Sequence, residues 1–192
     1  MDTLTLRLAR PEDAPALRDI YAPYVRETAI SFEYDVPSIA EFTQRIERTL
    51  IKYPYLAAES DGELLGYAYA GPFHERPAYQ WAAEATVYVK RGSHKRGVGK
   101  RLYQTLEDCL RRQNICTVNA CVAYPRGGDP YLTTNSADFH RHLGYRQVGE
   151  FHNCGYKFGR WYDMIWMEKE LIPPPEVPSP VTPFPAVAFE MV

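Results

Sequence analysis

Apolar and polar residues alternate in several stretches of the chain and predict the strands of a sheet. Residues 4–8 place a leucine at every second position, which is typical of a strand with one buried face. The stretch 53–71 predicts two strands joined at Asp61-Gly62, because this dipeptide favours a two-residue hairpin turn. Further strands are expected at 84–89, 115–124, 145–152 and 161–170.

Apolar residues at helical spacing predict helices between these strands. The segments 10–25 and 136–145 have this spacing, and the segment from Gly97 to about residue 112 repeats Val or Leu every four residues. In 37–50, Ser38 and Glu41 stand in the relation of a capping box at the start of a helix. The order of elements predicts an α/β, three-layer fold, in which helices cover both faces of a mixed sheet.

The last part of the chain has a different composition. Seven of the 16 prolines fall between 173 and 185, so this stretch is unsuited to an ordinary helix or a central strand. We therefore expect one domain at 1–171 and a tail at 172–192 that is extended or mobile and carries no chemistry.

Composition and charge exclude several classes of protein. With a net charge of −2, the chain lacks the basic excess that bulk nucleic-acid binding needs. The four cysteines form no C-x-x-C pair, so no metal site is expected. No apolar run is long enough for a membrane span, and the first residues do not resemble a signal peptide, which predicts a cytoplasmic protein. The 15 tyrosines suggest a pocket with polar and aromatic walls.

The loop at 90–101 carries three glycines among basic residues and stands between a predicted strand and a predicted helix. Glycines at a helix N-terminus let an anion approach unpaired backbone N–H groups. A nucleotide P-loop does not fit, because His94 and Arg101 replace its first glycine and its Ser/Thr. A dinucleotide-binding motif lacks its third glycine. The pattern alone leaves a basic surface turn and an anion site open.

Three segments resemble a known family. "HKRGVGKRL" resembles the acyl-CoA pyrophosphate loop of the GNAT acetyltransferases, [Q/R]-x-x-G-x-[G/A], with His94 in place of Gln or Arg. "FHERPAYQWAAEATVYV" (73–89) and "YKFGRWYDMIWM" (156–167) resemble the branch that acetylates the α-amine of phosphinothricin and of methionine sulfoximine or sulfone. The resemblance covers about residues 4–170. It implies a GNAT-type, mostly antiparallel central sheet and acetyl-CoA as the co-substrate.

The resemblance also implies a catalytic pair. Glu84 matches the general base of the branch, and its alanine neighbours predict an apolar setting that raises the carboxyl pKa. His140 stands where the branch usually has a histidine near the thiol, and we expect it to act as the acid. A backbone N–H at 87–88 is implied as the group that polarises the thioester carbonyl.

Further residues are implied to hold acetyl-CoA. Residues 87–89 would pair with the pantetheine arm, the loop would hold the pyrophosphate, and a later helix would add polar contacts. At the start of that helix the family pattern is altered, so Thr133 remains an alternative to Asn135. The expected cofactor-binding residues are Val87, Tyr88, Val89, Lys95, Arg96, Gly97, Val98, Gly99, Lys100, Asn135 and Ser136.

The substrate is expected to be a small amine whose anionic groups meet basic residues. Glu33 occupies a position where glufosinate-acting members can carry Arg, which weakens the case for glufosinate itself. The implied substrate-binding residues are Phe32, His74, Arg76 and Tyr79, with Lys157 and Arg160 from the second subunit of a homodimer. Two alternatives stay open: acetylation of protein N-termini or lysines, and a CoA-binding module without catalysis.

Overall fold

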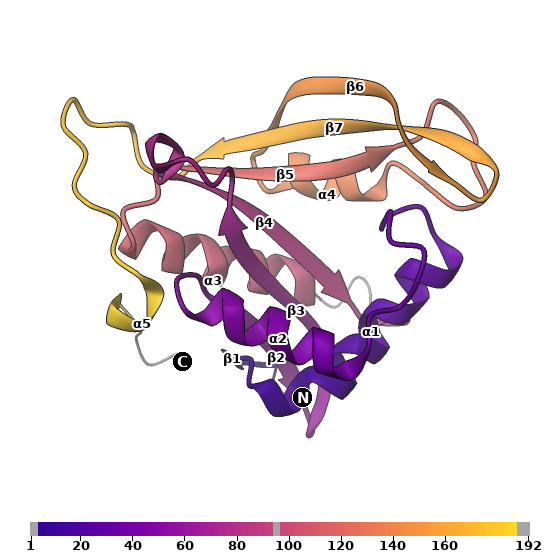
Figure 1. Ribbon diagram of the computed structural model, residues 1–192, viewed down its shortest axis with the longest axis horizontal. Coiled ribbons are helices and arrows are strands. Elements are labelled where there is room, and N and C mark those ends of the chain that lie inside the picture. Colours follow the sequence, from indigo (N-terminus) through magenta and orange to yellow (C-terminus); the bar gives the residue numbers. More distant parts are fainter. Residues whose placement is uncertain (1–3, 94–96, 188–192) are drawn as a thin grey trace.

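The computed structural model describes residues 4–93 and 97–187, and this part of the chain contains a seven-stranded sheet. The strand order is β1-β2-β3-β4-β5-β7-β6, and every neighbouring pair is antiparallel except β4 and β5 (Figure 1). The prediction of a mixed, mostly antiparallel sheet is therefore confirmed. The strands are β1 (Thr5–Leu8), β2 (Tyr55–Ser60), β3 (Glu63–Pro72), β4 (Ala82–Val89), β5 (Thr117–Tyr124), β6 (Arg146–Lys157) and β7 (Arg160–Glu170).

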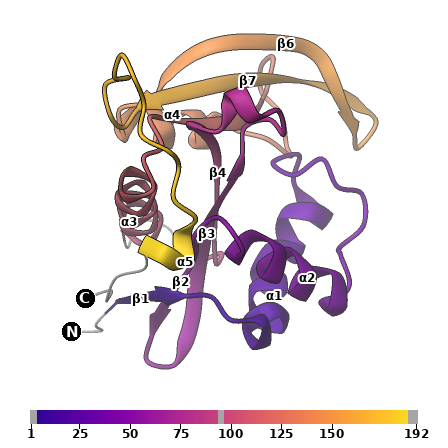
Figure 2. The same cartoon turned by 60° about the vertical axis from the view of Figure 1, so that its left-hand side comes forward.

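Helices cover both faces of the sheet, as predicted. Figure 2 shows α1 and α2 on one side of β3 and β4, and α3 on the other side. The alternation within β2 explains the arrangement, because Leu56 packs in the core that contains α3, whereas Tyr55 packs in the core that contains α1 and α2. The helices are α1 (Ala14–Glu27), α2 (Ile39–Leu50), α3 (Val98–Arg112), α4 (Asn135–His142) and α5 (Phe184–Val187), with short 3-10 turns η1 (Pro11–Asp13) and η2 (Pro77–Tyr79).

Two local predictions are confirmed by backbone geometry. Asp61 and Gly62 have φ angles of 52° and 78°, so the two-residue turn between β2 and β3 is of the primed type that matches strand twist. The Ser38 side chain accepts a hydrogen bond of 3.1 Å from the backbone N–H of Glu41 and caps α2.

The parallel pair β4–β5 separates after a short stretch. Residues Ala82–Glu84 pair with Thr117–Asn119, and beyond this point the two strands diverge (Figure 1). Both strands continue for several residues, so the sheet opens into a fork between Ala85–Val89 and the end of β5. This fork positions the candidate site.

Strand β6 is longer than the sequence indicates, whereas β7 agrees with the expected 161–170 to within one residue. The expected strand at 145–152 is β6, which continues to Lys157 and turns at Phe158-Gly159, where φ is 51° and 72°. β6 is the edge strand and most of its residues are exposed, so burial imposes little apolar alternation that would mark its end.

The proline-rich tail is extended over much of its length and lies against the domain. Trp81 Nε1 donates a hydrogen bond of 2.8 Å to the Ser179 carbonyl, and the Gln113 side chain donates to the Thr182 carbonyl at 2.9 Å. Phe184 in α5 is 2% exposed. The described tail residues are thus docked on the domain, extended up to α5 at Phe184–Val187. The division of the chain into a domain at 1–171 and a tail at 172–192 stays a prediction. In the described part of the chain, no helix has the length and apolar character that crossing a membrane requires.

Candidate active site

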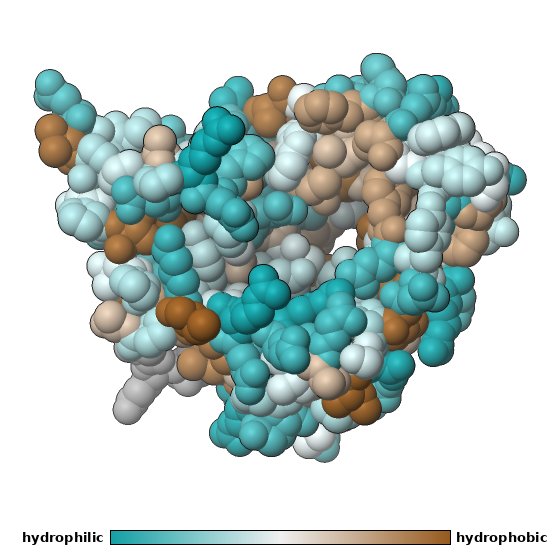
Figure 3. All heavy atoms as spheres, in the orientation of Figure 1, coloured by the Kyte–Doolittle hydropathy of each residue, from teal (hydrophilic) through white to brown (hydrophobic). Residues whose placement is uncertain are grey.

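A cavity of about 400 Å³ lies at the fork between β4 and β5. Figure 3 shows this face of the molecule hollowed between strands β5–β7 and helix α2. The wall combines β4, β5, α3, α4 and the segment after α1, and it brings together six of the predicted site residues. These are Phe32, Glu84, Val87, Tyr88, Ser136 and His140.

Glu84 occupies the point at which the two strands part. It pairs with Gly71 on β3 and with Asn119 on β5, and it is the last residue of β4 in register with β5. Burial raises the pKa of the Glu84 carboxyl, as the alanines beside it predict. Within the described residues no hydrogen bond or ion pair occupies this carboxylate, so it is free to accept a proton from a ligand in the cavity.

Among the described residues, the edge of β4 beyond Glu84 has no strand partner on the β5 side. From Ala85 to Val89 the strand pairs only with β3, so its second edge is open to a ligand. The Tyr24 hydroxyl donates a hydrogen bond of 2.5 Å to the Val89 carbonyl and holds the end of this edge. An extended amide chain can add here as a further strand, which is the seat expected for the pantetheine arm at Val87, Tyr88 and Val89.

Helix α3 begins where the glycine-rich loop ends. Gly97 is the N-cap residue with φ 78°, a left-handed conformation that glycine adopts without strain. Val98 is buried, and the N–H groups of a helix's first turn are suited to an anion. Anion binding by this turn, with Gly99 and Lys100, stays a prediction. Lys95 and Arg96 lie outside the described residues.

The start of α4 separates two predicted cofactor contacts. Ser136 lines the cavity, whereas Asn135 is exposed and lies outside the cavity wall. Thr133, the alternative to Asn135, accepts a hydrogen bond of 3.4 Å from the Asn135 backbone N–H. The choice between these two side chains as a CoA contact stays a prediction.

His140 lies in the cavity wall and is 4% exposed. Its Nδ1 is 2.7 Å from the Ser136 carbonyl oxygen, which only accepts, so Nδ1 carries the proton. Its Nε2 is 2.8 Å from the Tyr103 hydroxyl, which therefore donates to it. Burial lowers the pKa of His140, so the neutral imidazole is favoured and the pair with Tyr103 must be considered as one unit.

Only some of the residues expected to bind the substrate line this cavity. Phe32 lines the cavity, and its ring lies against Gly155 of β6. His74, Arg76 and Tyr79 are exposed on the connection between β3 and β4 and do not line the cavity. Their placement in a binding site stays a prediction.

Lys157 makes structural contacts that the sequence does not indicate. It is 3% exposed, and its ammonium group donates to the carbonyl oxygens of Val25 and Ser31 at 2.7 and 2.6 Å. These bonds tie the end of β6 to α1 and to the segment after it, which gives Lys157 a structural role and uses two of its three donors. A contribution of Lys157 to a substrate site stays a prediction. Arg160 pairs with Asp129 at 3.2 Å, and a contribution from it across a dimer stays a prediction.

A second cavity, of about 580 Å³, adjoins the first and was not predicted from individual motifs. It is walled by six tyrosines, which agrees with the aromatic pocket that the tyrosine content suggests, and by basic residues of α2 and the turn after it. The tyrosines are Tyr21, Tyr53, Tyr55, Tyr67, Tyr69 and Tyr88, and the basic residues are Arg45, Arg48 and Lys52.

Within the described residues one group has the spacing of metal ligands: Glu150, His152 and Asp163. Arg126 donates to both carboxylate oxygens of Asp163 at 2.9 and 2.8 Å and already balances its charge. The absence of a resident metal stays a prediction.

The open strand edge, the glycine-capped helix and the free carboxylate at the fork define the site of an enzyme that takes an acyl-CoA. A family model described as an acetyltransferase (GNAT) domain matches residues 6–166. The chain belongs to the GNAT acetyltransferase family, and it is an acetyl-CoA-dependent N-acetyltransferase.

Similar proteins agree with this assignment. The chain is 35% identical over 179 residues to a phosphinothricin N-acetyltransferase of Streptomyces viridochromogenes, covering 92% of this chain and 94% of the relative. It is 30% identical to an L-methionine sulfoximine/L-methionine sulfone acetyltransferase of Salmonella typhimurium, covering 88% and 95%. The crystal structure of a phosphinothricin acetyltransferase from Sinorhizobium meliloti in complex with acetyl-CoA superposes with a TM-score of 0.82 at 30% identity, covering 95% and 98%.

Proposed function

We propose that the protein transfers the acetyl group of acetyl-CoA to the α-amine of a small amino-acid-like substrate of the phosphinothricin or methionine sulfoximine/sulfone type. The observation that carries this proposal is Glu84, a partially buried carboxylate at the fork of β4 and β5 that has no hydrogen-bond or ion-pair partner in the described part of the chain. The names of the relatives supply the substrate type.

The reaction proceeds by direct attack. Glu84 accepts a proton from the substrate ammonium group, and its raised pKa brings the carboxyl closer to the working pH of a general base. The freed amine forms a bond to the thioester carbonyl carbon as the C–S bond breaks. Backbone N–H groups on the open edge of β4, at Val87 or Tyr88, stabilise the developing oxyanion.

The leaving thiolate receives its proton from the Tyr103–His140 pair. Both residues line the cavity, and the hydrogen between the Tyr103 oxygen and His140 Nε2 is the one that can move, because Nδ1–H is bound to the Ser136 carbonyl. In this scheme His140 Nε2 accepts from the Tyr103 hydroxyl and orients it, and Tyr103 gives its proton to the thiolate. The tyrosine oxygen regains a proton from the amine nitrogen, which loses its second proton as the amide forms. His140 stays neutral throughout, which fits its lowered pKa.

Tyr103→Phe tests the proton source. We expect kcat to fall by at most about 10²-fold, the low end of general acid catalysis, because a thiolate leaves readily even without help. The KM for acetyl-CoA should stay within about twofold, since the phenyl ring still packs on His140 at the same place. Tyr145→Phe is the matched control, because Tyr145 also packs on His140 but does not line the cavity. Equal kcat values for both variants and the unmodified protein would remove the pair from the mechanism.

A substrate panel tests the function itself. Purified protein is incubated with acetyl-CoA and glufosinate, methionine sulfoximine, methionine sulfone or a lysine-bearing peptide, and thiol release and acetylated product are measured. We expect product with at least one of the three amino acids and none with the peptide. Product from the peptide alone indicates a protein acetyltransferase. Binding of acetyl-CoA without any product contradicts the proposed substrate class and leaves a CoA-binding module as the alternative.

A further inference from the structure

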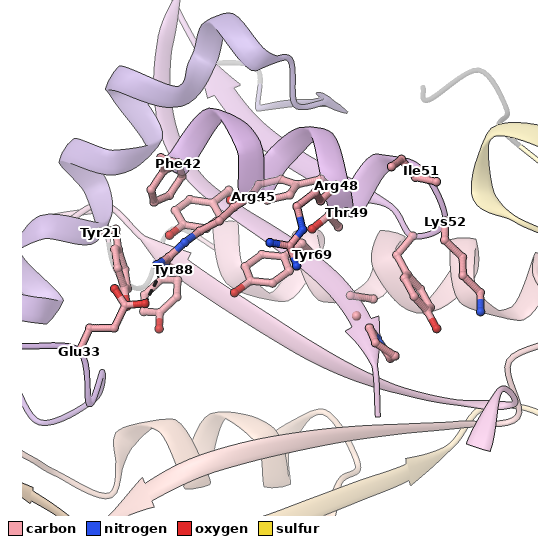
Figure 4. A pocket seen from close by; sticks show the side chains of 16 residues that line it. Tyr21, Glu33, Phe42, Arg45, Arg48, Thr49, Ile51, Lys52, Tyr69 and Tyr88 are labelled. Carbon is pink, nitrogen blue, oxygen red and sulfur yellow. Dashed lines mark ion pairs between the residues drawn. The ribbon is translucent and has the colours of Figure 1, made fainter. Parts of the chain in front are cut away.

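The two cavities are adjacent chambers with a common wall. Tyr21, Glu33, Tyr69 and Tyr88 line both of them, so a molecule whose amine lies beside Glu84 can extend past this wall. We call the larger cavity, beneath α2, the tyrosine chamber. Figure 4 shows Arg45 and Arg48 reaching from α2 toward the tyrosine rings and Glu33 approaching from the opposite side.

The chambers carry opposite charges. The smaller one is lined by two carboxylates, Glu33 and Glu84, and no lysine or arginine stands among its described lining residues. The tyrosine chamber is lined by Arg45, Arg48 and Lys52 against the single carboxylate of Glu33. This separation is complementary to a molecule with an ammonium group at one end and an anion at the other.

The two arginines of the tyrosine chamber differ in the ion pairs that their guanidinium groups make within the protein. Arg45 pairs with Glu33 at 2.8 Å and with Glu41 at 2.7 Å, so its charge is balanced within the protein. Arg48 makes no hydrogen bond or ion pair with any described residue. Of these two arginines, Arg48 is therefore the one whose N–H donors and positive charge are available to a ligand.

The surroundings of Arg48 strengthen an ion pair with a ligand. Tyr55, Tyr67 and Tyr69 form a stack, with ring centroids 5.6 and 4.9 Å apart, and Tyr55 and Tyr67 are buried. Such a wall excludes water from one side of a bound anion and lowers the local dielectric. Burial also raises the pKa of Tyr69, so its hydroxyl stays neutral and does not repel an anion.

We propose that the tyrosine chamber is an anion subsite, in which Arg48, assisted by Lys52, binds a carboxylate or phosphinate group of the amine substrate. The substrate class is then an amino acid, free at its acid group, and not a neutral amine or a polyamine. The inference rests on the proposed function, because it assumes that the amine lies at Glu84. It places substrate recognition on α2, outside the segments that resemble the phosphinothricin branch.

The test compares Arg48→Gln with the unmodified protein on three substrates that share an α-amine. Glufosinate carries two acidic groups, methionine sulfone carries one, and methionine sulfone carboxamide carries none. We expect the variant to raise the KM for substrates bearing the recognised anion about 10-fold or more, with kcat within about twofold and the carboxamide unaffected. Arg48→Lys should restore part of the loss, because it keeps the charge without the guanidinium fork.

The controls separate the subsite from the function. Arg26→Gln removes an exposed arginine of α1 that lines neither chamber, and it should change nothing. A loss with both acids points to the α-carboxylate, and a loss with glufosinate alone points to the phosphinate; both support the subsite. A KM ratio between variant and unmodified protein that is equal for all three substrates overturns it.

A binding measurement covers the case in which no substrate turns over. Glufosinate and methionine sulfone are titrated into the protein in a calorimeter with CoA present. The dissociation constants then report binding at the subsite without catalysis. If the unmodified protein acetylates nothing but binds an acid about 10-fold more tightly than Arg48→Gln does, the proposed function fails and the subsite stands. Equal binding by the two proteins rejects the subsite.

Discussion

Glu84→Gln should lower kcat by about 10²- to 10⁴-fold, the range of a lost general base. The amide cannot accept the proton of the substrate ammonium, but it has almost the same shape as the carboxylate. The carboxylate makes no hydrogen bond or ion pair with the described residues, so its replacement breaks no internal contact. Acetyl-CoA affinity should stay within about twofold, because the open edge of β4 and the start of α3 are unchanged.

The pH dependence gives this prediction a second measurement. A base is active when deprotonated, so kcat/KM of the unmodified protein should rise with pH through the pKa of Glu84, and burial moves that rise above the ordinary range of a glutamate. This rise of kcat/KM with pH should be absent in Glu84→Gln. Glu47→Gln, on the exposed face of α2, is the control and should keep both the turnover rate and the rise with pH. Unchanged turnover of Glu84→Gln at pH 7 would show that another group is the base.

The fold could be predicted from the sequence where burial imposes a pattern. Leu6 and the alternating residues of β2 face cores on defined sides, and the Asp61-Gly62 turn has a primed backbone that matches the twist of the two strands. The end of β6 could not be predicted in the same way. Most residues of this edge strand are exposed, so burial does not require apolar and polar residues to alternate along it.

The candidate site was predictable only in part, for a geometric reason. Glu84 could be identified from its motif and its alanine neighbours, but the parting of β4 and β5 beside it depends on pairing between distant segments. Arg48 gave no signal, because a charged residue on the polar face of an amphipathic helix is typical of a solvated surface. Only the packing of α2 over β3 places it beside a tyrosine wall.

Lys157 shows what a motif leaves open. In the sequence it is a basic residue within a family-like segment, which favours a role in binding anions. In the structure two of its three ammonium donors are taken by backbone carbonyls, one near the end of α1 and one in the following segment. A motif fixes where a residue lies along the chain, but its free donors depend on which loops pack against it.

Phe184→Ala should lower the free energy of unfolding by about 3 kcal/mol, the usual cost of removing a buried aromatic ring. For a domain of this size the expected fall in Tm is about 6–12 °C, measured by thermal unfolding. The backbone N–H of Phe184 donates to the Lys52 carbonyl at 3.0 Å, and the Gln113 side chain donates to the same oxygen at 2.8 Å. The backbone of Phe184 therefore joins the tail to the turn that follows α2, and the buried ring stabilises the docked tail.

Val177→Ala is the matched control within the same tail, because Val177 is 83% exposed and should leave Tm unchanged. Trp81 reports whether the tail has come away locally, since its indole N–H is bound to the Ser179 carbonyl and its fluorescence should change when that bond is lost. Equal Tm values for the two variants would mean that the tail only rests on the surface. A loss confined to Phe184→Ala would instead make the tail part of the domain. Because the anchored turn carries Lys52, which lines the tyrosine chamber, the proline-rich segment would then support one wall of the substrate site.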